Sequence, residues 1–272
     1  MPVPYRTSFN GKLDRLSSLI DRLRVHVSNA LVDEDGPAPT ESLPANLCVY
    51  RSSTDDLRLA FSPVRNGRAR HFPDMMQKDG ETLLVGARIG ISGIGGQLVN
   101  ALPDCLSVCL TSDPNLQAVV APLVEEATEP RCGGQAVFHR LCEVVVIRLL
   151  RHAIEEGNVE TGLLNGLSHP RIAAALVAIH EAPGESWTLE KLAETAGMSR
   201  TQFAVTFKEL VGSTPMGYLS GWRLEIARAE LQSGRQVKSV ASMCGFASAA
   251  AFSRAFSRRF GHPPKQKRQT AA

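Results

Sequence analysis

The sequence has no long apolar segment of the kind that directs a chain into or across a membrane. Its first residues, MPVPYRTSFNGK, lack the apolar run of a signal peptide. The most apolar stretch, EVVVIRLL, is interrupted by Arg148 and is far shorter than the roughly 20 residues that span a bilayer. We therefore expect a cytoplasmic protein with no membrane partner. Its 272 residues, 43% of them hydrophobic, suffice for two folded domains.

Metal-binding and disulfide patterns are also missing. None of the six cysteines belongs to a C-x-x-C pair or has a zinc-like spacing to histidine. In a reducing compartment most of them are expected to be buried as small apolar side chains. Cys105 and Cys109 lie four residues apart, and they leave a thiol-based redox sensor open as an alternative. We expect neither a metal nor a cofactor.

The catalytic motifs in the sequence are incomplete. The stretch from Gly90 to Ile94, GISGI, approaches the G-x-S-x-G nucleophile motif, but Ile94 occupies the second glycine position. Read as a dinucleotide loop, Gly90-x-Ser92-x-x-Gly95 has serine in place of the middle glycine. The glycines are equally consistent with bulges or barrel corners. The sequence therefore predicts that the protein is not an enzyme.

The charge is distributed unevenly along the chain. Residues 1–167 contain 16 lysines and arginines against 20 acidic residues, a balance of −4, whereas residues 168–272 contain 14 against 7, a balance of +7. A basic module of this kind favours a polyanionic partner. The partner of the carboxy-terminal third is therefore predicted to be a polyanion.

The basic third contains an internal repeat. Ala193 and Gly197 recur 48 residues later, and a second set recurs 49 residues later: Phe203, Phe207, Gly212 and Pro215 as Phe252, Phe256, Gly261 and Pro264. In the first copy, residues 189–196 predict a short amphipathic helix, Gly197 a turn, and Ser199 the cap of a second helix that ends near Val211. The phenylalanines form the core side of that helix. Its other face, with Arg200, is free to read a DNA groove.

The second copy has the same plan. Residues 237–244 and 248–260 predict its two helices, and Phe252, Phe256 and Phe260 predict its core side. Between the copies, Pro215 begins a helix that ends at Gly234 and spans roughly 27 Å at 1.5 Å per residue. A spacer of this size places two reading helices in successive major grooves, about 34 Å apart. The repeat therefore predicts double-stranded DNA as the partner.

The repeat resembles the double helix-turn-helix of the AraC-type transcription regulators. The resemblance covers about residues 170–268 and is carried most specifically by GFASAAAFSRAFSRRFGHPP. It implies a base-facing set in each copy: Thr201, Gln202, Ala204 and Val205 in the first, and Ala249, Ala250, Ser253 and Arg254 in the second. Alanine and valine form no hydrogen bond with a base edge, whereas Arg254 is able to bond guanine. Much of the affinity is therefore expected from phosphate contacts by Arg223, Arg258, Arg259, Lys265, Lys267 and Arg268.

The acidic half predicts a small sheet followed by helices. Its expected strands are residues 47–51, 57–64, 82–93 and 105–110, and its expected helices are 122–127 and 134–156. The longer helix has Val137, Leu141, Val144, Val145 and Leu149 on one side, which predicts a homodimer face. The order of elements resembles the cupin-like sensor half of AraC-type proteins, without the histidine cluster that binds a metal in some cupins. The predicted fold is α+β: a cupin-like small β-barrel with helices over residues 1–165, and an all-α pair of helix-turn-helix units joined by a linker helix over residues 166–272.

An arginine cluster in this half is the candidate effector site. Arg65, Arg68 and Arg70 surround an Asn-Gly turn signal and precede Ser92 and Gly95 by about two strands. The combination is similar to the PilZ-type cyclic-di-GMP motif, R-x-x-x-R followed by (D/N)-x-S-x-x-G, from which the arginine spacing and Gly90 depart. The resemblance implies a nucleotide effector whose phosphates the arginines hold. A solvated loop is the alternative for this cluster, and a DNA binder without effector is the alternative for the whole protein.

Overall fold

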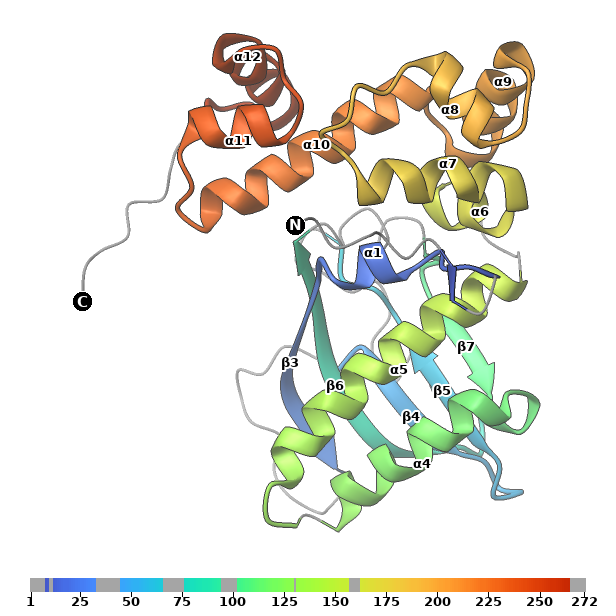
Figure 1. Ribbon diagram of the computed structural model, residues 1–272. Coiled ribbons are helices and arrows are strands. Elements are labelled where there is room, and N and C mark those ends of the chain that lie inside the picture. The colour runs from blue at the N-terminus through green and yellow to red at the C-terminus, as the bar shows by residue number, and fades with distance from the viewer. Residues whose placement is uncertain are drawn as a thin grey trace. The chain divides into compact units, whose positions relative to one another are not determined.

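The computed structural model describes residues 8–9, 12–32, 45–65, 76–93, 102–129, 131–156 and 162–264. These residues fall into two units (Figure 1). The sheet unit comprises the described residues of Arg24–Ser92 and Gly96–Glu160. The helical unit comprises the described residues of Met1–Leu23 and Thr161–Ala272, and it also includes Gly93. The α+β class predicted from the sequence is confirmed.

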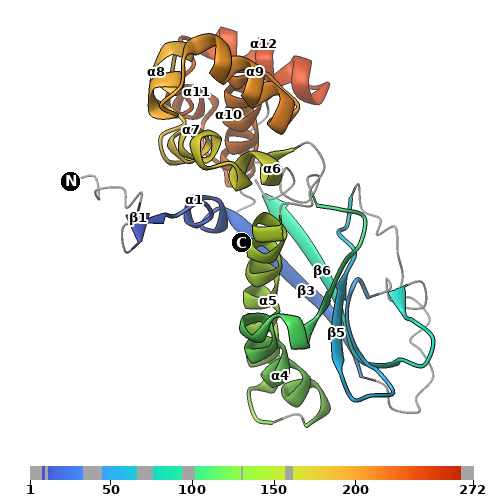
Figure 2. The same cartoon turned by 90° about the vertical axis from the view of Figure 1, so that its right-hand side faces the viewer.

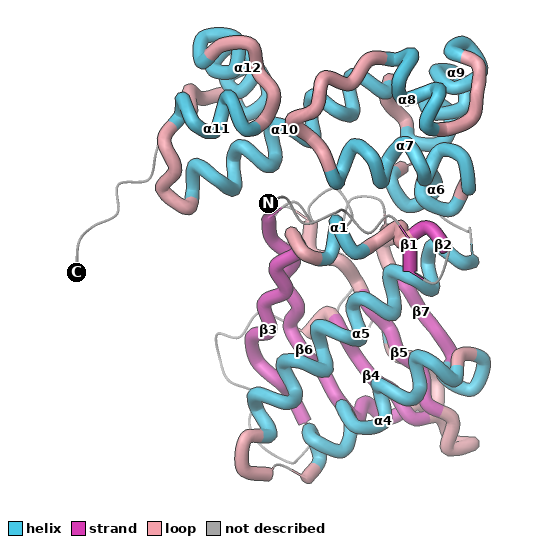
Figure 3. Tube along the Cα trace, in the orientation of Figure 1, coloured by secondary structure: helices cyan, strands magenta, loops and turns pink. Residues whose placement is uncertain are grey.

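The sheet unit is built on five strands in the order β3-β6-β4-β5-β7. Their bounds are β3 Leu23–Val32, β4 Leu47–Arg51, β5 Leu57–Phe61, β6 Thr82–Gly93 and β7 Leu106–Cys109. The pairs β4–β5, β4–β6 and β5–β7 are antiparallel. A tube drawing shows the strands side by side (Figure 3). The sequence predicted β4 and β6 residue for residue, because alternating β-branched and apolar residues between turn signals are typical of strands.

Two helices cover one face of this sheet (Figure 2). They are α4, Pro114–Thr128, which follows the short 3-10 turn η1, Leu110–Ser112, and α5, Gly134–Glu156. The bounds predicted for α5 are confirmed. The start predicted for the first helix, at Pro122, is wrong: the helix begins at Pro114, and the Asp113 side chain accepts a hydrogen bond from the Leu116 N–H. Proline is favoured in a first helical turn, and here Pro114 occupies that turn while Pro122 lies inside the helix.

Buried polar groups tie the strands together. The Asn46 side-chain amide donates to the carbonyl oxygens of Ser62 (2.9 Å) and Ile89 (3.1 Å), and its oxygen accepts from the Ile89 N–H (2.6 Å). Asn46 is fully buried, so these bonds satisfy an amide that has no access to water. Next to it, Cys48, Tyr50, Ala60 and Met76 form an apolar cluster. The core of the unit thus reaches the centre of the sheet.

The helical unit contains the predicted repeat. Its helices are α6 Leu163–Ser168, α7 Pro170–Glu181, α8 Leu189–Thr195, α9 Arg200–Val211, α10 Pro215–Gln232, α11 Val237–Met243 and α12 Ala249–Phe260. Helices α8 and α9 form the first copy, α11 and α12 the second, and α10 joins them (Figure 1). The all-α pair of helix-turn-helix units with a linker helix is confirmed, and the predicted bounds of α9 and α12 agree to within one residue.

The two copies repeat the same local contacts. Ser199 caps α9 by accepting from the Gln202 N–H, and Ser248 caps α12 by accepting from the Ala251 N–H. The turn glycines have positive φ angles, +60° at Gly197 and +71° at Gly245, a region in which other residues are strained. The caps and glycines explain why both copies adopt the same helix-turn-helix structure.

Residues near the start of the chain belong to the helical unit, although the sequence placed the domain boundary at residues 165 and 166. This segment includes the short helix α1, Ser17–Ile20, after the two-residue strands β1, Ser8–Phe9, and β2, Lys12–Leu13. The Arg15 guanidinium donates to the carbonyl oxygens of Leu167 (2.8 Å) and Ser168 (3.2 Å) at the end of α6. A cation bonded to the last carbonyls of a helix stabilises that end.

Candidate nucleic-acid interface

The first reading helix presents the residues expected from the sequence. Thr201, Gln202 and Val205 are exposed in the first turns of α9, and Ala204 is half-buried. Val205 is 51% exposed, so its branched apolar side chain is accessible to an apolar group such as a thymine methyl. Arg200 is exposed and forms an ion pair with Glu190 at 3.1 Å. The structure therefore brings the whole predicted set of the first copy to one end of α9.

The second reading helix offers fewer polar groups. Ala249 and Ser253 are half-buried on α12, whereas Ala250 and Arg254 are exposed. Arg254 is consequently the member of this set that has two donors for a base edge. At the other end of α12, Arg258 and Arg259 are exposed, and Arg259 lies 3.8 Å from a Glu225 carboxylate oxygen. Lys265, Lys267 and Arg268 lie outside the described residues.

Arg223, for which the sequence predicts a phosphate contact, has partners inside the protein. Its Nε donates to the Pro183 carbonyl oxygen at 2.6 Å and its Nη2 to the Glu185 carbonyl oxygen at 2.7 Å. Burial lowers the pKa of the guanidinium. A half-buried arginine bonded to two backbone carbonyls serves the protein's own fold, and the phosphate contact stays a prediction.

The cores of the two copies hold the reading helices in place. Phe203 and Phe207 of the first copy and Phe252 and Phe256 of the second are buried, and in each copy the two ring centroids lie 5.5 Å apart. Beside the first pair, the buried His180 Nε2 lies 2.6 Å from the Tyr218 hydroxyl, and its ring lies 4.3 Å from that of Trp222. Burial lowers the pKa of His180 to about 3, so this side chain is neutral in the folded unit.

The candidate effector residues are only partly described. Arg65 donates from Nη1 to the Asp104 carboxylate at 2.7 Å and from Nη2 to the Leu102 carbonyl oxygen. Ser92 lies near the end of β6. Arg68, Arg70 and Gly95 lie outside the described residues, so their distances to Arg65 and Ser92 are not given by the structure. The ion pair between Arg65 and Asp104 is partly open to water, with the two side chains 24% and 37% exposed.

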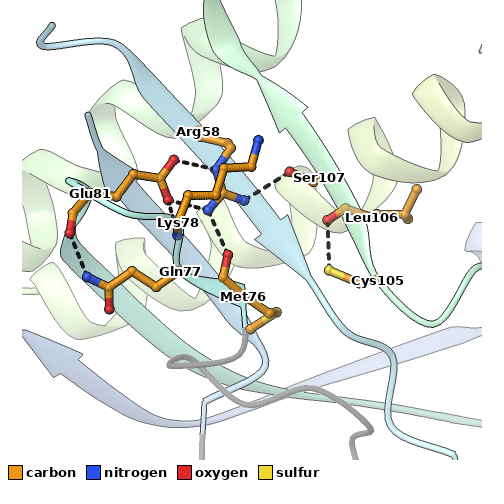
Figure 4. A network of polar contacts seen from close by, with 8 residues as sticks. All are labelled: Arg58, Met76, Gln77, Lys78, Glu81, Cys105, Leu106 and Ser107. Carbon is orange, nitrogen blue, oxygen red and sulfur yellow. Dashed lines mark hydrogen bonds and ion pairs between the residues drawn. The ribbon is translucent and has the colours of Figure 1, made fainter. Parts of the chain in front are cut away.

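A second arginine of the sheet unit is paired internally, and the sequence analysis did not single it out (Figure 4). Arg58 donates from Nε to Glu81 at 2.6 Å, from Nη1 to the Ser107 hydroxyl at 2.9 Å, and from Nη2 to the Met76 carbonyl oxygen at 2.7 Å and to Glu81. Bonding to Arg58 lowers the pKa of Glu81, and bonding to Glu81 raises that of Arg58. With four of its five N–H donors used, Arg58 holds the sheet together and has little capacity left for a ligand.

The cysteine pair of the redox alternative lies along one strand. Cys105 directly precedes β7 and Cys109 ends it. Four residues of extended chain separate their α-carbons by roughly 13 Å, about twice the separation that a disulfide allows. Burial raises the pKa of Cys105, which opposes formation of the reactive thiolate. Redox sensing through a bond between these two cysteines in one chain gains no support from this geometry.

Comparison with known proteins identifies both halves of the chain. A family model described as a helix-turn-helix domain matches residues 192–270, and one described as a cupin matches residues 25–155. A cupin match followed by a helix-turn-helix match is the order of domains that the resemblance to AraC-type regulators implies. The resemblances noted in the sequence to the AraC-type and cupin families are confirmed at this level. The described helices include none that is long and apolar enough to cross a membrane.

The chain is similar to several regulators of this kind. It is 33% identical over 181 residues to the HTH-type transcriptional regulator AlkR of Acinetobacter baylyi, covering 65% of this chain and 59% of that protein. It is 34% identical over 151 residues to a putative AraC-like transcription regulator of Streptomyces lividans, covering 55% of this chain and 50% of that protein. The chain thus spans between about half and three-fifths of the length of these relatives.

One solved structure that is similar to about a third of the chain is that of a DNA-binding domain. The DNA-binding domain of AdpA, crystallised in complex with a target DNA, is 34% identical, covers 34% of this chain and 84% of that chain, and gives a TM-score of 0.33. The two relatives named above are described as transcription regulators, and neither description names an enzyme.

Proposed function

We propose that the protein is a transcription regulator that binds double-stranded DNA through the first turns of α9 and α12. The observation that carries this proposal is the duplicated helix-turn-helix on a module of net charge +7, in which the exposed members of the expected sets are Thr201, Gln202 and Val205 on α9 and Ala250 and Arg254 on α12. A basic module with two exposed helix starts matches the charge and shape of a major groove.

The test is a selection of binding sites from a random DNA library with the full chain. We expect the library to converge on a site with two half-sites, and fluorescence anisotropy to give a tighter Kd for it than for a scrambled duplex, with both values weakening as salt rises. A library that does not converge, with equal affinity for all duplexes, contradicts sequence-specific binding.

We further propose that the amino-terminal half of the chain binds an anionic nucleotide, with cyclic-di-GMP as the ligand, through Arg65, Arg68, Arg70, Ser92 and Gly95. The proposal is supported by the motif in the sequence and by charge: three arginines lie close together in a half of the chain whose balance is −4. Two phosphates neutralise such a cluster, and two guanines offer faces on which guanidinium groups stack.

The contacts of Arg65 show that a ligand phosphate would compete with Asp104 for the guanidinium. Because Asp104 holds the guanidinium at 2.7 Å, a phosphate has to replace that carboxylate or share the arginine with it.

Calorimetry with cyclic-di-GMP should show saturable heat for the wild type and large losses for Arg65→Ala and Arg68→Ala. Gly95→Val is expected to obstruct the ligand. Arg51→Ala is the matched control, because Arg51 is an exposed arginine of the same unit paired with Asp55. An absence of heat from folded wild-type protein at tens of micromolar ligand contradicts this ligand.

The proposed regulator is a homodimer through α5. Only part of the α5 face predicted for the dimer lies on the surface. Val145 and Leu149 are buried within the sheet unit. Val137 and Val144 are 43% and 40% exposed, and Leu141 between them is half-buried. Residues 137, 141 and 144 follow the i, i+4, i+7 spacing of one helix face. An apolar stripe of this kind on the outside of a unit supports association with a second copy.

A further inference from the structure

The two helix-turn-helix copies contact each other through backbone that approaches unusually closely. The loop of residues 182–188, between α7 and α8, leads into the first copy, and residues 243–245 are the last residue of α11 and the start of the turn in the second. A β-carbon added at Gly184 would lie 2.6 Å from the Met243 carbonyl oxygen, and one added at Gly245 would lie 2.7 Å from the Gly184 carbonyl oxygen. Real β-carbons do not approach this closely, so each glycine makes room for the backbone of the other copy.

Arg223 of the linker helix α10 holds this loop in place. Its Nε and Nη2 donate to the carbonyl oxygens of Pro183 and Glu185, on either side of Gly184. Its Nη2 also lies against the turn, 2.9 Å from where a β-carbon of Gly245 would be. The drawing of the chain shows the loop beside the middle of α10 (Figure 3). The side chain of this one linker residue therefore contacts both the loop of the first copy and the turn of the second.

The loop has a further anchor on its own side. The Trp187 indole N–H donates to the Ala182 carbonyl oxygen at 2.8 Å, so three carbonyls of the loop accept a side-chain hydrogen bond. Apart from the contact between Gly184 and the turn, the two copies are joined through α10, which packs against α8, α9, α11 and α12. The contact adds a second point of attachment, which restricts tilting of one copy relative to the other.

We propose that Arg223, together with Gly184 and Gly245, is a positioning element that fixes α9 relative to α12 and thereby sets which half-site spacing the protein accepts. This inference rests on the proposed DNA-binding function. One added base pair moves a half-site by about 3.4 Å and rotates it by about 35° around the DNA axis. A rigid pair of reading helices is unable to follow that change, whereas a hinged pair follows it in part. The clamp is thus expected to determine spacing specificity without contacting DNA.

The experiment compares the selected site with versions that carry one base pair more or fewer between the half-sites. For the wild type we expect binding at least about tenfold tighter at the selected spacing. Arg223→Ala and Arg223→Lys should reduce this preference to within about threefold. Lysine keeps the positive charge but lacks the forked donors, so it separates the clamp from a phosphate contact. Gly184→Ala tests the same contact from the other side, because a β-carbon there meets backbone.

Two variants serve as controls. Gly221→Ala adds a β-carbon on α10 that has nothing within 4 Å, and Lys238→Ala removes an exposed charge from α11. Both are expected to keep the wild-type ratio of affinities, since a lost phosphate contact weakens both spacings equally. Circular dichroism and unfolding curves establish whether each variant is folded. If Arg223→Ala does not fold, the spacing preference of Gly184→Ala tests the clamp instead.

The outcomes separate this inference from the proposed function. If the wild type selects no sequence, the DNA-binding proposal fails. If the wild type selects a site but tolerates altered spacing, or if the folded variants at both Arg223 and Gly184 keep its preference, the clamp is overturned. Retention of the preference by Arg223→Lys alongside its loss in Arg223→Ala also overturns the clamp, because the charge alone would then be sufficient.

Discussion

Arg254 is an exposed arginine on a reading helix whose other expected contacts are alanines and one serine. A bidentate contact from arginine to guanine is worth about 1–3 kcal/mol of discrimination, whereas an alanine offers only its methyl group. We predict that Arg254→Ala weakens binding to the selected site by about that amount and changes binding to a scrambled duplex little. Anisotropy titrations measure both. Arg151→Ala, which removes an exposed charge from the sheet unit, is the control. Unchanged affinity for the site would show that α12 reads DNA with other residues.

His180 links the stability of the helical unit to pH. Burial, with a smaller contribution from Arg22, lowers its pKa to about 3, against about 6.5 for an unfolded histidine. Between these values the unfolded chain binds one more proton at this residue than the folded chain. The stabilisation is therefore complete above about pH 6.5 and is lost as the pH falls towards 3, by about 2 kcal/mol between pH 7 and pH 5.

A glutamine in place of His180 keeps a polar side chain beside the Tyr218 hydroxyl but does not titrate. We predict that the free energy of unfolding of His180→Gln declines less steeply from pH 7 to pH 5 than that of the wild type, whatever the cost of the substitution at pH 7. Both tryptophans, Trp187 and Trp222, lie in the helical unit, so their fluorescence follows its unfolding. Parallel pH dependences in the two proteins would refute a neutral His180 in the folded unit.

At the scale of the helix, the repeat predicts that equivalent phenylalanines of the two copies are equally important for stability and DNA binding. Phe203 and Phe252 are each fully buried at matching positions of α9 and α12. Truncating a buried phenylalanine to alanine costs about 3–5 kcal/mol. Phe203→Ala and Phe252→Ala should therefore lower the denaturant midpoint of the fluorescence transition, and each should abolish tight DNA binding. Val205→Ala, on the exposed side of α9, should leave that midpoint close to the wild-type value. A full-affinity complex with either phenylalanine variant would be incompatible with two reading helices.

The elements that the sequence predicted well are those whose signals are local. Ser199 and Ser248 as caps, glycines at the turns and phenylalanines at i and i+4 specify the helices of both copies without reference to the rest of the chain. The start of α4 was missed because Pro122 was read as a helix start. Asp113 before Pro114 is the better signal, since it supplies both a capping side chain and a proline in the first turn.

Contacts between residues far apart in the sequence were beyond prediction. Arg65 pairs with Asp104, 39 residues later, and Arg223 bonds to carbonyls 40 and 38 residues earlier. An arginine in a sequence is equally consistent with a phosphate contact, a carboxylate pair or a backbone clamp, because the guanidinium offers the same donors to each. The backbone approach of Gly184 to Gly245 has no sequence signal other than the two glycines themselves.

For the molecule as a whole, association through α5 is open to a direct test. A carboxylate in the exposed stripe has to be buried without a partner when two copies meet, which is strongly unfavourable. We predict that Val137→Glu with Val144→Glu shifts the protein from dimer to monomer in sedimentation velocity at micromolar concentration. The control is Ala136→Glu, an exposed position about 100° around the helix from Val137. A wild-type protein that sediments as a monomer, or a double variant that stays dimeric, excludes this face.

The proposed control of DNA binding by a nucleotide is a coupling between two binding free energies. If the ligand changes the affinity for DNA by some factor, DNA must change the affinity for the ligand by the same factor, and such couplings are typically about 5–150-fold. We predict that saturating cyclic-di-GMP shifts the Kd for the selected duplex by a factor in this range. Saturating duplex should shift the Kd for cyclic-di-GMP equally and in the same direction. Arg65→Ala should lose both shifts while keeping the DNA affinity of the ligand-free wild type, because the arginine lies in the sheet unit and the duplex binds the helical unit. Arg51→Ala should retain both. Binding of the nucleotide with no change in DNA affinity would mean that the ligand binds both states of the protein equally, and a ligand without differential affinity shifts no equilibrium.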